Sequence, residues 1–290
     1  MEDLIKALNS PDEVDRIYAA QDIAETKNSG HVVHLLERLS VEKSQAANDA
    51  IVFALKNLSC SGNYDMLFKL FRSPEPYLRN AAIGIFGSEK GEALSFLSSH
   101  LNHADGEVRK LILDALFATG DSGIVEVIRQ SLHDPSVNVR ITAAEYLGRM
   151  GDRDSVNELI RMFQKESEPM LRTSVLDSLL LIGELQDIIN FFSITAPDGD
   201  FTKTEPLYLP QIINLAVKTG DAIIICKVLD TIPDIGIYSE DIIHALDQAE
   251  RKFKGLCRHA DILNIIEKIM EKTTDKELHA LCRELVGSNS

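Results

Sequence analysis

Tryptophan is absent from this 290-residue sequence, and aromatic residues make up only 6% of it. Trp often anchors protein interfaces and stacks on nucleic-acid bases, so neither use is open to this chain. Positive charge is also scarce, because 30 Lys and Arg face 45 Asp and Glu, giving a net charge of −15. A phosphate backbone needs a cationic surface, and no Lys/Arg cluster provides one, so we expect no nucleic-acid binding.

Cysteines and long apolar runs are few as well. The four cysteines are scattered and form no Cys-x-x-Cys pair; they are Cys60, Cys226, Cys257 and Cys282. A long chain with few cysteines is typical of a reduced, intracellular protein, and we expect a cytoplasmic location. The acidic N-terminus lacks the apolar core of a signal peptide, and the most apolar stretch, Ala222 to Val228, is too short to span a bilayer. We therefore expect no membrane insertion.

What the sequence does contain is a recurring phrase centred on arginine. The arginines of this column are Arg16, Arg79, Arg109, Arg140 and Arg172. From Arg79 onward they are 30, 31 and 32 residues apart, and Ala47 takes the arginine position in the interval between Arg16 and Arg79. A constant period of this length indicates a repeat protein, and the column defines six repeats over residues 1–187.

Each repeat has the pattern of two helices joined by a turn. In three repeats a proline precedes the arginine by five positions, and apolar residues follow it by three, four and seven, as Ala143, Ala144 and Leu147 follow Arg140. That spacing is the buried stripe of a helix, and a second apolar stripe lies before each proline. One helix pair cannot bury its own apolar face, but a stack of pairs can. The sequence therefore predicts an all-α fold, a right-handed solenoid of antiparallel helix pairs.

The phrase resembles the short HEAT-like repeats named after the phycobilisome lyases, most clearly in DPSVNVRITAAEYLGRMGDRDSVNELIRMF, residues 134–163. The resemblance implies a ladder of hydrogen bonds between neighbouring repeats, made by a turn Asp and the arginine of the second helix. Asp134 with Arg140 matches that pattern best. We accordingly interpret the whole arginine column, together with Asp134, as structural, since it coincides with the repeat.

After Gly183 the phrase fades, although helical patterns continue to Val286. A segment rich in Pro, Gly, Asp and Thr, residues 195–206, interrupts them and predicts a long loop. Residues 188–290 are either divergent helical repeats or a C-terminal helical cap, which a repeat array needs to close its core.

No catalytic, metal or cofactor motif stands out. His31 with His34 and His100 with His103 are pairs at helical spacing, but no Cys or Glu recurs beside them, so we expect surface histidines and no metal site. The His-Glu dipeptides of the deoxyhypusine hydroxylases are missing, which excludes that activity. No residue matches a catalytic role of the phycobilin lyases either. An accessory or lyase role in chromophore attachment stays open only because the repeat type is theirs.

One row of residues favours binding. Five positions after the arginine column lie Asp114, Glu145 and Asp177, in three successive repeats and away from the buried stripe. In solenoids of this type the second helices line the concave face, so these carboxylates could receive Lys or Arg side chains of a partner. A solvated polar face explains the same residues. We therefore predict a scaffold or adaptor that is not an enzyme, needs no cofactor, and binds another protein, with a basic segment of that protein as the candidate contact.

Overall fold

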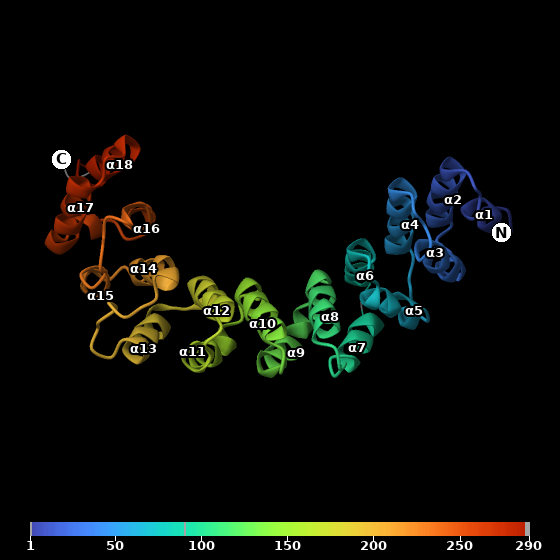
Figure 1. The fold of residues 1–290 in the computed structure, drawn as a ribbon, viewed down its shortest axis with the longest axis horizontal. Coiled ribbons are helices and arrows are strands. Elements are labelled where there is room, and N and C mark those ends of the chain that lie inside the picture. The colour runs from blue at the N-terminus through green and yellow to red at the C-terminus, as the bar shows by residue number, and fades with distance from the viewer. Residues whose placement is uncertain (1, 90, 288–290) are drawn as a thin grey trace. The chain divides into compact units, whose positions relative to one another are not determined.

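The computed structural model describes residues 2–89 and 91–287, and every regular element in these ranges is helical. The predicted all-α class is confirmed (Figure 1). The chain forms two compact parts, Met1–Tyr146 and Leu147–Ser290, called the N-terminal and C-terminal parts below. None of the described helices is both long enough and apolar enough to cross a membrane.

The N-terminal part is built from helix pairs, each with a short first helix and a longer second helix. Its helices are α1 (Glu2–Leu8), α2 (Glu13–Thr26), α3 (Val32–Leu39), α4 (Gln45–Asn57), α5 (Tyr64–Lys69), α6 (Pro76–Ser88), α7 (Glu92–Ser99), α8 (Gly106–Ala118), α9 (Val125–Gln130) and α10 (Val137–Met150), the last of which runs past the boundary. The second helices pack in order, α2 on α4, α4 on α6 and α6 on α8, while α1 contacts α3 and α3 contacts α5. The pairs therefore stack as two layers within this part (Figure 1).

The C-terminal part contains α11 (Val156–Lys165), α12 (Pro169–Ile182), α13 (Leu185–Thr195), α14 (Leu209–Lys218), α15 (Ala222–Leu229), α16 (Ser239–Lys252), α17 (Ala260–Lys272) and α18 (Lys276–Gly287). The even-numbered helices again pack in order from α12 to α18, and α15 packs on α17. The alternation of two layers thus extends beyond Gly183, where the repeated phrase ends. The predicted loop is present, since α13 ends at Thr195 and the next helical turn begins at Pro206.

The local sequence explains where the second helices begin and which of their faces is buried. The Asp12 carboxylate caps α2 by accepting a hydrogen bond from the Val14 amide, which would otherwise lack a partner. Ala19, Ala20 and Ile23 follow Arg16 by three, four and seven positions, and each is no more than 2% exposed. The stripe predicted from periodicity is therefore the face that these helices bury.

Neighbouring second helices approach closely where one of them carries glycine. A Cβ atom added to Gly87 of α6 would lie 2.7 Å from the Ala118 Cβ of α8. In the C-terminal part, a Cβ atom on Gly148 would lie 2.6 Å from the Ser178 Oγ of α12. Both glycines stand eight positions after their column arginine, so the lack of a side chain there sets the spacing between adjacent repeats.

Candidate functional site

The arginine column lines the turns between first and second helices. In four repeats the arginine Nη1 donates to the main-chain carbonyl oxygens six and five positions before it, over 2.6–3.3 Å. These four residues are Arg16, Arg79, Arg109 and Arg140. Carbonyls at the end of a helix have no partner within the helix, and a guanidinium can serve two of them at once. Each of these arginines thus closes its own turn.

Arg16 and Arg109 also reach the next repeat through a carboxylate. Arg16 donates from Nε and Nη2 to Glu42, over 2.7 and 2.9 Å, and Arg109 donates in the same way to Asp134, over 2.7 Å for each bond. The side chain of Asp134 therefore pairs with the arginine of the preceding repeat. Arg140 binds the main-chain oxygen of Asp134 instead. A contact between neighbouring repeats, of the kind that the resemblance implies, is made here by the side chains of Asp134 and Arg109.

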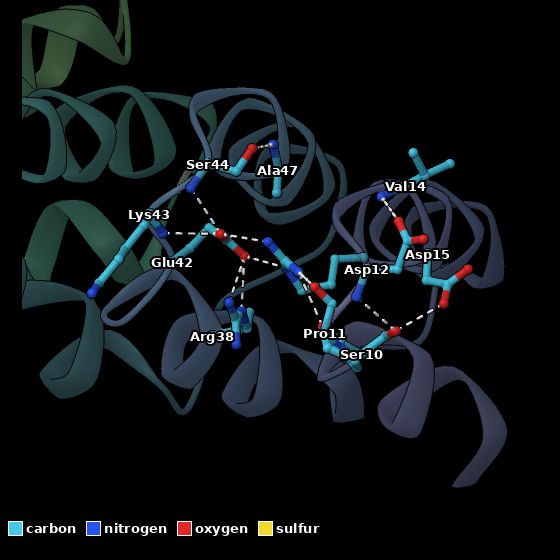
Figure 2. Close-up of polar contacts among 11 residues, drawn as sticks. Ser10, Pro11, Asp12, Val14, Asp15, Arg38, Glu42, Lys43, Ser44 and Ala47 are labelled. Atoms are coloured by element: carbon cyan, nitrogen blue, oxygen red, sulfur yellow. Dashed lines mark hydrogen bonds and ion pairs between the residues drawn. The ribbon is translucent and has the colours of Figure 1, made fainter.

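Glu42 is the most heavily bonded carboxylate of this group (Figure 2). It accepts hydrogen bonds from Arg16, Arg38 and the main-chain amides of Lys43 and Ser44, and its side chain is only 1% exposed. Burial acts to raise its pKa, but the bonds from Arg16, from the Ser44 amide and from Arg38 outweigh burial and lower the pKa to about 2. Glu42 lies in the repeat that has Ala47 in place of arginine, and sequence reasoning did not single it out.

Asp114 and Glu145 lie on second helices of the N-terminal part, and Asp177 lies on α12 of the C-terminal part. Asp114 is bound internally, accepting from Lys110 Nζ at 3.0 Å and from the Tyr146 hydroxyl at 2.6 Å. Glu145 and Asp177 are exposed. Removal of water by neighbouring groups raises the pKa of Asp177, and a hydrogen bond with Gln211 opposes that rise. The three members of the predicted row thus have different surroundings.

An apolar groove between α2 and α4 was not predicted. It has a volume of about 820 Å³ and is lined by Ile17, Ala50 and Phe53, with Glu25 and Asp49 among its polar residues. Phe53 is 57% exposed, and the groove places it together with Ile17 and Ala50, so its exposed apolar surface is not isolated. The groove lies on second helices of the N-terminal part, as Asp114 and Glu145 do.

A small basic pocket lies between second helices of the C-terminal part. It has a volume of about 300 Å³ and includes Lys218 of α14 and Lys252 of α16. Burial and the nearby charges of Lys252 and Arg153 lower the pKa of Lys218. The Lys218 ammonium also donates to the carbonyl of Leu180 near the end of α12, which is a structural role. The second helices are therefore not uniformly acidic.

His31 is only 3% exposed, so the expected surface position is wrong for it. The ring of His100 is tilted against those of Phe96 and Phe68, at centroid distances of 4.3 and 4.7 Å, and His103 Nδ1 accepts a hydrogen bond from the Asp105 amide. Within residues 2–89 and 91–287, no group of three or more His, Cys, Asp or Glu is placed to hold a metal ion. All four cysteines are buried. Burial raises the pKa of the Cys60 thiol to about 12, so its reactive thiolate form is suppressed.

Comparison with known proteins supports the repeat. Residues 94–180 match the family model of HEAT repeats. No protein of curated function matches the chain. Among solved structures, YibA of Escherichia coli is 18% identical, with 86% of this chain and 92% of that chain covered and a TM-score of 0.47. An engineered protein is 17% identical, with 99% and 98% covered and a TM-score of 0.45.

A third solved structure is the complex of CpcE and CpcF of phycocyanin lyase from Nostoc. It is 18% identical, with 87% of this chain and 93% of that chain covered and a TM-score of 0.34. At such identities and scores, neither the activity nor the partners of those proteins transfer to this chain. The match over residues 94–180 confirms the HEAT repeat that the arginine phrase predicted.

Proposed function

We propose that this HEAT-repeat protein is a scaffold without enzymatic activity, which binds a basic segment of another protein along its second helices. The observation that carries the proposal is the set of acidic side chains on these helices, Asp114, Glu145 and Asp177, in a chain of net charge −15. Lys or Arg of a partner would pair with them. Each exposed pair adds only about 0.2–1 kcal/mol, so several must act together.

The groove between α2 and α4 adds an apolar element to the proposed surface. Burial of apolar area favours a complex, although the loss of translational and side-chain freedom offsets part of the gain, whereas exposed ion pairs mainly steer the approach of the partner. Phe53, which is more than half exposed, would gain from being covered by an apolar partner residue. A basic segment with one or two apolar side chains therefore fits this surface better than a uniformly charged one.

We further infer that residues 188–290 continue the array of repeats, because their helices pack in the same alternating way.

The test is a triple substitution, Asp114→Asn, Glu145→Gln and Asp177→Asn, in a pull-down from the source cell. Binding of the captured partner should weaken and lose part of its salt dependence, because fewer ion pairs are screened. A matched control removes three acidic groups from first helices instead: Glu37→Gln, Glu126→Gln and Glu158→Gln. If the first triple variant binds the partner with unchanged affinity at low salt, then Asp114, Glu145 and Asp177 are only a solvated polar face and do not bind the partner.

The alternative, a lyase-like or accessory role in chromophore attachment, is separated from the scaffold by one measurement. A protein that handles bilin should bind free bilin and change its absorbance spectrum, while a scaffold for a basic segment should leave the spectrum unchanged.

The cytoplasmic location and the lack of nucleic-acid binding stay predictions. A mobility-shift assay at physiological salt tests the second of them.

A further inference from the structure

Arg172 departs from the role that the other arginines of its column perform. The other four close their own turns through two main-chain carbonyls. Across the described residues, the guanidinium of Arg172 makes one hydrogen bond, from Nη1 to Glu205 Oε1, at a long 3.4 Å. Within the part of the chain that the structure describes, the Arg172 side chain makes no hydrogen bond to the carbonyls of its α11–α12 turn, so the repeat alone does not account for the placement of this side chain.

Aromatic rings hold the Arg172 guanidinium. Its Cζ atom lies 4.2 Å from the ring centroid of Phe163 and 4.7 Å from that of Tyr208. The two aromatic residues are only 3% and 1% exposed, so they form a rigid support. The Nε atom is buried beside them with no hydrogen-bond partner. Stacking therefore fixes the plane of the guanidinium, while the side chain stays 24% exposed.

The exposed part of Arg172 lines a pocket of about 270 Å³ beside the loop between α13 and α14. Lys203, Thr204 and Glu205 of that loop line it too. Glu205 is 58% exposed, so water competes with Arg172 for its carboxylate, and the ion pair adds little to the stability of the fold. A guanidinium that is held flat, with its donors turned to a pocket, has the geometry for a carboxylate bound through two parallel hydrogen bonds.

We propose that this pocket binds a carboxylate from another molecule, and that the incoming group displaces Glu205 from Arg172. The chemical class follows from the present occupant, since Glu205 places a carboxylate against the guanidinium. Asp198 and Asp200 line the same pocket and repel an anion, while Lys203 opposes them, so the affinity for a lone carboxylate is modest. The proposal concerns the C-terminal part alone and does not depend on the acidic row.

The test uses the full chain and acetate as the probe, at constant ionic strength. Arginine Nε–H signals are followed by NMR, and the Arg172 signal is identified by its loss in Arg172→Gln. We expect acetate to shift this signal saturably and chloride to leave it in place. Glu205→Gln removes the internal competitor, and should raise the acetate affinity about 1.5- to 5-fold, which is the value of one exposed ion pair. Arg161, 61% exposed on α11, supplies a matched control in Arg161→Gln, which should bind acetate like wild type.

Three outcomes would overturn the proposal. The first is an Arg172 signal that does not respond to acetate, and the second is an acetate affinity that Glu205→Gln leaves unchanged or lowers. The third is a saturable response to inorganic phosphate without one to acetate. If Arg172→Gln unfolds, Arg172→Lys identifies the signal in its place, because it keeps the positive charge beside Phe163 and Tyr208, and the exposed Glu205 can still be replaced to complete the test. Binding of a basic partner along the second helices would be unaffected in every case, so this proposal and the scaffold function fail separately.

Discussion

Replacing Glu42 by Gln should destabilise the N-terminal part by about 3–5 kcal/mol at pH 7, the usual cost of breaking a buried ion pair from one side. The structural reason is that two arginines, Arg16 and Arg38, converge on this carboxylate, which is 1% exposed. The amide of Gln keeps one acceptor oxygen but directs an NH₂ group at a guanidinium. The cost is large because both cations stay in place without their anion.

The dependence on pH gives a second, independent magnitude. The pKa of Glu42 falls from 4.5 to about 2 in the folded state, and such a difference is worth about 3 kcal/mol. A lowered folded-state pKa means that the stabilisation is fully present above pH 4.5 and is lost as the pH falls toward 2. The difference in unfolding free energy between wild type and Glu42→Gln should therefore shrink across this window.

Urea unfolding at several pH values measures these differences. Because repeat proteins can unfold in stages, hydrogen exchange of the amides in α2, α3 and α4 should accompany it. Glu37→Gln is the matched control, since Glu37 is on α3 and its side chain is 63% exposed; it should change stability by less than about 0.5 kcal/mol. Equal stability of wild type and Glu42→Gln at pH 7 would refute the reasoning.

Three further predictions concern packing and thiol chemistry. Leu147→Ala should cost about 2–5 kcal/mol in unfolding free energy, because Leu147 is fully buried, and an unchanged denaturation midpoint would contradict its assigned register. Gly87→Val should cost at least about 1–3 kcal/mol by thermal unfolding, because its Cβ would lie 2.7 Å from the Ala118 Cβ. The four cysteines should react slowly with a disulfide reagent at pH 8 in the native protein and quickly in urea; rapid native labelling would show that a thiol is accessible.

The helix pairs could be predicted because local rules and packing agree at the same residues. A proline before the second helix, a capping Asp or Ser and a stripe at helical spacing each indicate the same start and the same buried face. Ala19 and Ile23 show the agreement, since the positions chosen by periodicity are the buried ones. The phrase fades after Gly183, yet the helices continue, because packing needs an apolar stripe and not a particular arginine.

The partners of the arginines could not be predicted in the same way. Glu42 follows Arg16 by 26 residues and Asp134 follows Arg109 by 25. Asp105 likewise stands 26 residues after Arg79, but its carboxylate accepts from the Glu107 amide at the start of α8. A carboxylate at this spacing does not by itself predict a bond to the preceding arginine, because the geometry of each turn decides where the carboxylate lies. The placement of Arg172 depends on a loop more than twenty residues later in the chain, so no local sequence pattern predicts it.

Asp114 shows that equivalent positions in successive repeats can have different local contacts. Its place in the repeat predicted an acidic group ready for a partner, but Lys110 lies four residues earlier on the same helix, at the spacing of an intrahelical ion pair. The Tyr146 hydroxyl, which stacking on Phe117 at 4.0 Å holds in position, takes the other carboxylate oxygen. A partner must break both contacts to use Asp114. Asp114→Asn alone should consequently weaken binding of the basic segment much less than the triple substitution does, and an equal loss would contradict this reading of Asp114.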